Sequence, residues 1–415
     1  MTVMTALRVK GLDRRTLDRL AGWLAVGVAV SLPWSSSATS ILLALWLLAV
    51  LATLDLGALR REFLSAAGGL PVLLWLLALA GMLWADVTWS ERYGGLSGFN
   101  RLLVIPLLLT QFRKSGHGMR VFAGFLISVT IVSLASWMLV SFPGLLWHPR
   151  LPGVPVKDYI IQSEEFLICA FGLLGVALAE YRAGRWRSIV WIVALAVLFL
   201  ADIFFVTTGR TTLLVAPPLL LLLGWRQMGL KGLIGAAAAG CIVGGAIWIG
   251  SPALRANLEK SATELESYEA NDANNSTGMH LEFLKKSLSF VATAPVVGHG
   301  TGSITEQFRN AAAAGGGSAS VVPVNPHNQI FAVAIQLGAL GTVVLLAMWA
   351  AHLLLFRGAG IVDWIGLVIV VQNVVASLFN SHLFDFTQGW LYVFGVGVAG
   401  GMVLRERDLA RSALR

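Results

Sequence analysis

Apolar stretches alternate with short polar segments along almost the whole chain of 415 residues. A helix needs roughly 20 mostly apolar residues to cross a hydrocarbon layer about 30 Å thick. The sequence divides into about twelve such stretches, which predicts an all-α integral membrane protein with about twelve transmembrane helices. The predicted spans are residues 20–34, 36–55, 70–86, 97–112, 120–144, 159–181, 187–206, 211–225, 230–250, 327–356, 361–380 and 385–404.

The composition also indicates a membrane protein. Hydrophobic residues make up 57% of the chain and charged residues 13%, which a soluble surface would not tolerate. The net charge of +8 would suggest nucleic acid in a soluble protein, but here it reflects the loops, so we expect no nucleic-acid partner. Cys169 and Cys241 both lie in apolar runs, which leaves neither a disulfide framework nor a cysteine zinc site. We expect no metal and no cofactor.

Positive charge is distributed unevenly between the two sets of loops. Most of the 30 Lys and Arg residues lie near the termini or in one set of short loops, for example at Arg60, Arg113, Arg226 and Arg357. Short loops rich in Lys and Arg remain in the cytoplasm. We therefore predict a multi-pass protein with both termini in the cytoplasm. The first apolar stretch shows no cleavage site of a signal peptide.

One long polar segment, residues 251–326, interrupts the spans and is predicted to lie on the outer face of a single membrane domain, residues 1–415. Ser251 can cap a first helix that has Pro252 at its first position. Ser276 or Thr277 can cap a second helix. Both helices are predicted to lie over the transmembrane body.

Two glycine-rich stretches of this segment allow unusual backbone conformations. The stretch Ala311–Ser320 is a candidate hinge or lid. The stretch Gly298–Ser303, which includes Gly300, is similar to a phosphate-binding loop, but no strand precedes it and no βαβ unit surrounds it. We expect its glycines to allow a sharp turn, and its backbone N–H groups can also face an anion.

His327 is the first candidate for chemistry. Asn325 at the cap and Pro326 at the first helical position would place His327 and Asn328 in the first turn of a long apolar helix. There the free N–H groups and the helix dipole favour an anion and lower the pKa of a histidine. A neutral imidazole at this place can act as a general base or donate a hydrogen bond to phosphate. The alternative is a histidine that is only hydrated at the headgroup level.

Arg210 is the second candidate. It lies in a very short turn, Thr207–Thr212, on the outer side, where short loops normally lack positive charge. An arginine near the membrane interface needs a partner, such as a lipid phosphate or a carboxylate. The four threonines and the glycine of this turn favour a polar pocket, and the alternative is an arginine that extends to the headgroups.

Further polar residues lie near the same face. His280 is on the apolar side of the second loop helix, where a histidine is more often part of a core than of a site, although docking could bring it over the same cavity. Gln162 lies early in a span that begins outside. Arg150 and Lys157 in the preceding loop add positive charge near the start of that span.

The sequence lacks the motifs of nucleotide-driven chemistry. It has no Walker-type loop and no Asp-x-Asp pair on the outer face. An enzyme that faces outward has no nucleotide donor in any case. Its substrate would have to be activated already and held in the membrane.

Several motifs occur in the order known from one family of membrane enzymes. With these motifs the chain resembles the O-antigen ligase and polymerase superfamily. The motifs are Gly209-Arg210-Thr211, the loop with Pro295, Gly298, Gly300 and Gly302, the pair His327-Asn328, and Gly338. The resemblance covers roughly the second half of the chain. In the first half, only hydropathy and the number of spans match.

The resemblance implies an inner-membrane enzyme of Gram-negative bacteria that acts on the periplasmic face. In the ligase branch, such an enzyme moves O-antigen glycan from undecaprenyl diphosphate to a sugar hydroxyl of lipid A-core, which completes lipopolysaccharide. His327 matches the essential histidine of the family, and Arg210 matches its outer arginine. Where the family often has Gly-Met-Arg, this chain has Gly278-Met279-His280. His280, Lys285 or Arg309 could substitute for the missing arginine.

We therefore hypothesise a direct, inverting attack that needs neither metal nor nucleotide. His327 acts as the base, and Arg210 with the helix start holds the diphosphate. One alternative is a polymerase that extends glycan on the lipid carrier. A transporter or flippase is a second alternative, but the sequence shows no internal repeat and too few polar residues inside the spans.

Overall fold

The computed structural model describes residues 13–145, 152–207, 209–271, 275–312 and 321–414, and in these ranges the chain is helical, without strands. The helices are α1 (Arg14–Ser31), α2 (Ser36–Thr53), α3 (Leu56–Phe63), α4 (Ala66–Gly81), α5 (Trp89–Asn100), η1 (Arg101–Leu103), α6 (Val104–Lys114), α7 (Gly118–Ser141), η2 (Pro143–Leu145), α8 (Tyr159–Arg182), α9 (Trp186–Phe205), α10 (Arg210–Gly250), α11 (Pro252–Asn271), α12 (Ser276–Thr293), α13 (Ile304–Ala312), α14 (Gln329–Leu355), α15 (Ile361–Ala376) and α16 (Phe386–Ala413). The protein is an all-α, multi-pass membrane protein.

Eight helices in the described ranges are long and apolar enough to cross a membrane, or nine if the bent pair α3 and α4 forms one span. The predicted count of about twelve is therefore not confirmed. Four features of the helices account for the difference. Helix α1 begins with several charges, α3 and α4 meet at 80°, α15 has only 16 residues, and α10 is one helix of 41 residues with a break at Met228 and Gly229.

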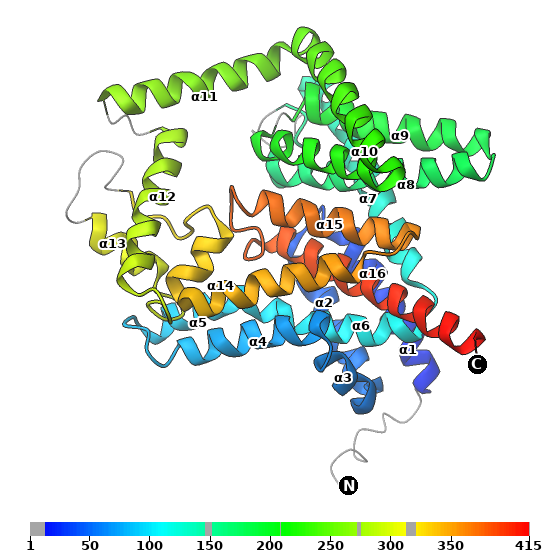
Figure 1. Cartoon of the computed structure of the whole chain (residues 1–415), viewed down its shortest axis with the longest axis horizontal. Helices are drawn as coiled ribbons and strands as arrows, with labels where there is room; N and C mark the ends of the chain where they lie inside the picture. Colours follow the sequence, from blue (N-terminus) through cyan, green and yellow to red (C-terminus); the bar gives the residue numbers. More distant parts are fainter. Residues whose placement is uncertain (1–12, 146–151, 208, 272–274, 313–320, 415) are drawn as a thin grey trace, which may run out of the picture.

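The helices pack side by side into one bundle (Figure 1). The start of α1 and the end of α16 lie at one end of the bundle, and α11, α12 and α13 lie at the opposite end. The core contains large apolar side chains such as Trp46, Phe99, Phe112 and Phe166, none of which is accessible to solvent. Helix α16 is the most enclosed span, with 89% of its apolar window buried by other helices.

Three helices, rather than the two predicted, occupy the long polar segment. The hydroxyl of Ser251 accepts a hydrogen bond from the Leu254 N–H, which confirms the predicted cap of α11. The predicted cap of α12 is wrong, because Asn275 takes that role by accepting from the Gly278 N–H. Of the candidate hinge 311–320, only the end of α13 falls within the described residues.

An apolar cluster fixes α12 and α13 against α14. The rings of Phe283 and Phe290 on α12 pack edge-on against Phe308 on α13, and Ala332 and Ile335 of α14 complete the cluster. The burial of aromatic rings in such a cluster contributes several kcal/mol in typical proteins, about 3–5 for a phenylalanine. The docking holds His280, which is also on α12, near the start of α14.

Helix α14 is broken at Gly338, whose φ of +60° is in the region that favours glycine. The backbone of the preceding glycine loop pairs with the chain at this break, where the Gly300 N–H donates to the Gln336 carbonyl and the Ala339 N–H donates to the Pro295 carbonyl. Gly298 and Gly300 also have positive φ values, as expected for a sharply turning loop. This loop is thus a structural clamp on α14.

Candidate active site

A cavity of about 740 Å³ lies where the starts of α8, α10 and α14 meet α11 and α12. Its lining includes Arg210, His280, His327 and Asn328, which come from three separate parts of the sequence. We call it the His327 cavity. The fold thus brings together four of the residues that the sequence analysis singled out.

His327 does not lie in the first turn of α14, contrary to the prediction. Helix α14 begins at Gln329, and Asn328 is its cap, because the Asn328 side chain accepts from the N–H groups of Ile330 and Phe331. His327 precedes the cap with a φ of +54°, an unusual value for a residue with a side chain. Its own N–H donates to the Asn325 side chain at 2.8 Å, which helps to hold this conformation. Such strained residues often occur at functional sites.

The ring of His327 is held between two aromatic neighbours. The ring of Phe283 stacks on it at a centroid distance of 5.7 Å and an angle of 9°. The ring of His280 meets it edge-on at 4.6 Å. Burial lowers the pKa of His327, and the side chains of Asn380 and Asp385 only partly offset this effect. His327 is therefore neutral at pH 7 and can accept a proton.

His280 cannot replace an arginine as a cation at neutral pH. Although the side chain borders the open cavity, the surrounding protein, His327 and Arg210 lower its pKa to about 4. A neutral imidazole still has one N–H donor and one acceptor nitrogen. His280 can therefore contact a substrate by a hydrogen bond but brings no positive charge.

Arg210 begins α10 and has a carboxylate partner, one of the two kinds of partner expected for it. Its Nε donates to Asn257 at 3.1 Å, and its Nη1 donates to the Glu264 carboxylate at 3.3 Å. The hydroxyl of Thr277 also donates to Glu264, at 2.7 Å. Burial raises the pKa of Glu264, but Thr277 and Arg210 outweigh burial and lower the pKa overall. A guanidinium has five N–H donors, so Arg210 keeps donors for an anionic substrate.

Five of the other predicted substrate-binding residues do not line the His327 cavity. They are held elsewhere: Lys285 pairs with Glu282, Arg309 pairs with Glu91 and Glu306, Gln162 donates to the Gly153 carbonyl, Lys157 donates to the Thr387 hydroxyl, and Gly300 belongs to the clamp on α14. Arg150 lies outside the described residues. Each of the five described residues has a partner elsewhere, so the packing of the helices does not bring them into one cavity with His327.

The sequence analysis missed several residues of this site. Asn257, Glu264 and Thr277 line the His327 cavity, and their role depends on how α11 and α12 dock, which no local pattern reveals. From the turn between α15 and α16, the Asn380 oxygen accepts from the Asn325 side chain, which in turn accepts from the His327 N–H, and Asp385 raises the pKa of His327 by its charge. Here a signal existed, because polar residues beside two apolar spans are unusual.

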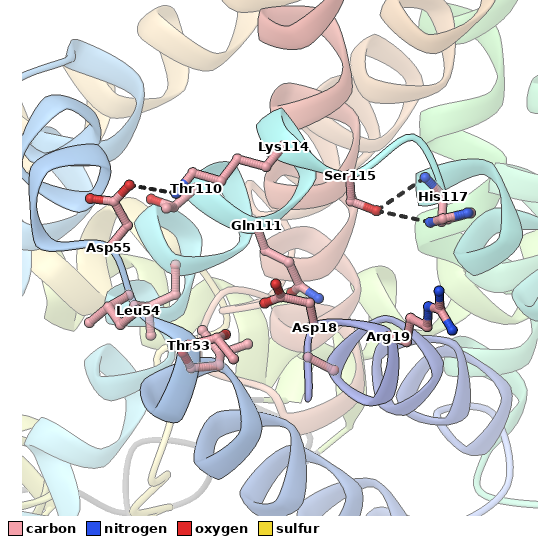
Figure 2. A pocket seen from close by; sticks show the side chains of 13 residues that line it. Asp18, Arg19, Thr53, Leu54, Asp55, Thr110, Gln111, Lys114, Ser115 and His117 are labelled. Carbon is pink, nitrogen blue, oxygen red and sulfur yellow. Dashed lines mark hydrogen bonds and ion pairs between the residues drawn. The ribbon is translucent and has the colours of Figure 1, made fainter. Parts of the chain in front are cut away.

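A second cavity lies at the opposite end of the bundle. It has a volume of about 230 Å³ and is lined by Asp18, Arg19, Asp55, Lys114 and His117, among others (Figure 2). The Lys114 ammonium donates to the Asp55 carboxylate at 2.8 Å, so part of its charge is neutralised within the cavity. Nowhere in the described ranges do three or more His, Cys, Asp or Glu side chains form a group that could hold a metal ion.

Fold and site together define a multi-pass membrane protein with a polar cavity at one end of its bundle, where neutral histidines lie beside an arginine. Residues 194–346 match the family described as O-antigen ligase. The matched part includes Arg210, His327 and Gly338, whose motifs predicted a resemblance to the O-antigen ligase and polymerase superfamily. Members of the family act on lipid-linked O-antigen. A comparison with curated proteins finds no match.

Proposed function

We propose that the protein is an O-antigen ligase, a glycosyltransferase of the bacterial inner membrane. It moves O-antigen glycan from undecaprenyl diphosphate to a sugar hydroxyl of lipid A-core, in the His327 cavity, on the periplasmic face. Both termini lie in the cytoplasm. The family match, which includes Arg210 and His327, supports this proposal.

The reaction is a direct displacement at the anomeric carbon. His327 accepts the proton of the acceptor hydroxyl, whose oxygen forms the new glycosidic bond. The bond between the anomeric carbon and the diphosphate oxygen breaks, and its electron pair leaves with undecaprenyl diphosphate. Arg210 donates hydrogen bonds to the leaving diphosphate and stabilises its growing negative charge. Attack from the face opposite the leaving group inverts the anomeric configuration.

One observation carries this assignment: the same cavity contains a neutral imidazole and a guanidinium that come from distant parts of the chain. A base and an anion-binding group are the two functions that the displacement needs. Phe331, Phe379 and Leu378 add apolar surface to the lining, which suits a lipid-linked donor.

The test is an assay of the purified protein with undecaprenyl-diphosphate glycan and lipid A-core, with EDTA and without nucleotide. We expect glycan on lipid A-core by mass spectrometry. His327→Ala should lower the rate by about 100- to 10,000-fold, the usual contribution of a general base. Phe142→Ala, a change of an exposed side chain outside the cavity, is the control and should retain activity.

Each other outcome has a distinct meaning. Longer glycans that remain on the lipid carrier would identify a polymerase. No covalent product from either substrate would contradict a transferase and favour transport. An unchanged rate in His327→Ala would contradict the role of His327 as base while leaving the transferase activity in place.

A further inference from the structure

Helix α11 has one polar face that borders the His327 cavity. Asn257, Lys260 and Glu264 line the cavity, and their spacing of three and four residues places them on one side of a helix. Two contacts from the start of α12 hold this face in place. The Asn275 side chain donates to the Glu264 carbonyl at 2.6 Å, and the Thr277 hydroxyl donates to the Glu264 carboxylate at 2.7 Å. The contact between α11 and α12 thus determines which residues of α11 a substrate meets.

The lining of the cavity has an excess of positive charge. Among the described residues that form it, Arg210 and Lys260 are the only Lys or Arg, and Glu264 is the only Asp or Glu. The two histidines of the lining, His280 and His327, are neutral at pH 7, because their pKa values are lowered. Since the charge of Glu264 balances that of Arg210, the remaining positive charge is that of Lys260.

The ammonium of Lys260 is available to a ligand. It lies 3.9 Å from Glu264 Oε1, a distance that allows an ion pair but is too long for a hydrogen bond. Its side chain forms no hydrogen bond within the part of the chain that the structure describes, so its three N–H groups can donate to a ligand. The side chain is 70% exposed at the border of the cavity, where a ligand can reach it.

One carboxylate holds the two cations near each other. Arg210 Nη1 lies 3.3 Å from Glu264 Oε2, and Lys260 Nζ lies 3.9 Å from Glu264 Oε1. The Glu264 side chain is only 13% exposed and is held by Thr277, so the point to which both cations are attracted is fixed. A diphosphate has negative oxygens on both of its phosphorus atoms and can therefore bind two neighbouring cations at once.

We infer that Lys260 binds the diphosphate of the lipid-linked donor together with Arg210, and that Glu264 holds the two cations side by side. The inference rests on the proposed function and adds a second binding residue to the donor site. An arginine that is already paired with a carboxylate does not balance the charge of a diphosphate. The ammonium of Lys260 supplies the additional positive charge.

The other cations suggested by the sequence do not fit this role. Lys285 and Arg309 do not line the cavity, and both have carboxylate partners elsewhere. His280 lines the cavity but is neutral at pH 7. The sequence analysis missed Lys260, because a lysine on a polar helix is usually only solvated. Its place beside Arg210 depends on how α11 docks.

The first test measures binding and does not depend on turnover. Undecaprenyl diphosphate and undecaprenyl monophosphate are each titrated into the purified full-length protein in detergent, and Kd is measured by microscale thermophoresis. Wild type should bind the diphosphate more tightly, because the monophosphate has only one group to offer to the two cations. Lys260→Gln should weaken diphosphate binding by about 10-fold, the low end for a hydrogen bond to a charged group, because the side chain is exposed. Monophosphate binding should change less.

Two further variants control for charge and for folding. Lys260→Arg keeps the positive charge and should retain most of the diphosphate affinity. Lys285→Gln is the matched control, because it removes the same charge from the neighbouring helix α12, outside the cavity, and should leave both Kd values unchanged. Since Lys260 is exposed, Lys260→Gln should keep the Tm of wild type.

Two results of the binding test would overturn the inference. One is a Kd for the diphosphate that is the same in Lys260→Gln and wild type. The other is an equal loss in Lys260→Gln and Lys285→Gln, which would show only an effect of the general surface charge. A wild type that binds the diphosphate no more tightly than the monophosphate would also contradict a site with two cations.

Steady-state kinetics separates this inference from the proposed function. Lys260→Gln should raise KM for the lipid-linked donor by about 10-fold and change kcat much less, because a residue that binds the diphosphate before and during the reaction contributes mainly to binding. KM for lipid A-core should stay unchanged. Glycan transfer with an unchanged donor KM in Lys260→Gln would overturn the inference and leave the proposed function in place. The expected loss of diphosphate binding in a protein that transfers no glycan would support the binding site and contradict only the proposed reaction.

Discussion

Arg210 has two partners at once, and this depends on the shape of its side chain. Nε reaches Asn257 while Nη1 reaches Glu264, and both bonds come from one planar group. A lysine has a single ammonium on a flexible stem and cannot reproduce this fork. The arginine is thereby oriented before any substrate arrives.

We therefore predict that Arg210→Lys lowers kcat/KM for the lipid-linked donor by about 10- to 100-fold, the equivalent of about 1.5–3 kcal/mol of hydrogen bonding to a charged group. The measurement is steady-state kinetics with purified protein. Arg255→Lys on α11 is the control. The guanidinium of Arg255 donates to the backbone carbonyls of Trp248 and Ile249, and Arg255 does not line the His327 cavity. An equal loss of kcat/KM in both variants would argue against a specific role of the two hydrogen bonds that orient Arg210.

At the scale of one element, the break in α14 links the glycine loop to the site. The helix segment before the break begins at the cap Asn328, next to His327, and ends at Gly338. The paired backbone of residues 295–302 holds this segment at a fixed angle. The position of His327 thus depends on a glycine that lies three turns away from it.

Gly338→Ala should disturb this break. A Cβ atom at Gly338 would collide with the carbonyl group of Val296, and a φ of +60° is unfavourable for alanine. We expect a loss of about 1–3 kcal/mol in the free energy of unfolding, a lower Tm and a lower kcat. Gly244→Ala in α10 is the control, since a Cβ there meets nothing within 4 Å. Thermal unfolding of both variants in detergent checks this prediction, and equal Tm values would contradict it.

At the scale of the whole molecule, the proposed function needs the His327 cavity to face the periplasm. The cavity and helices α11 to α13 lie at one end of the bundle, and the start of α1 and the end of α16 lie at the other. Because Lys and Arg resist transfer across the membrane, the basic loops near the termini should be cytoplasmic.

Thiol labelling can test this orientation. A cysteine introduced by Glu259→Cys on α11 should react with a membrane-impermeant reagent in spheroplasts, and one introduced by Ser412→Cys on α16 should react only after lysis. Both positions are exposed in the structure. The parent protein measures the labelling of the native Cys241, which is also exposed. The reverse pattern would contradict a periplasmic cavity.

The sequence by itself determined the all-α membrane class and the approximate positions of most apolar helices, and it singled out Arg210 and His327 as candidate site residues beside apolar helices. These features follow from hydropathy and charge, which are local properties of the chain. It did not determine the number of spans, because length and composition do not decide whether a bent pair or a short helix crosses the membrane.

Only the tertiary structure decided the partners within the site. Glu264 reaches Arg210 and His280 reaches His327 because α11 and α12 dock onto the bundle, which brings residues distant in sequence into contact. The same packing links Asn380 to Asn325 beside His327 and places the partners of Lys285 and Arg309 outside the cavity. Such choices depend on side-chain geometry across elements, and hydrophobic periodicity contains no information about it.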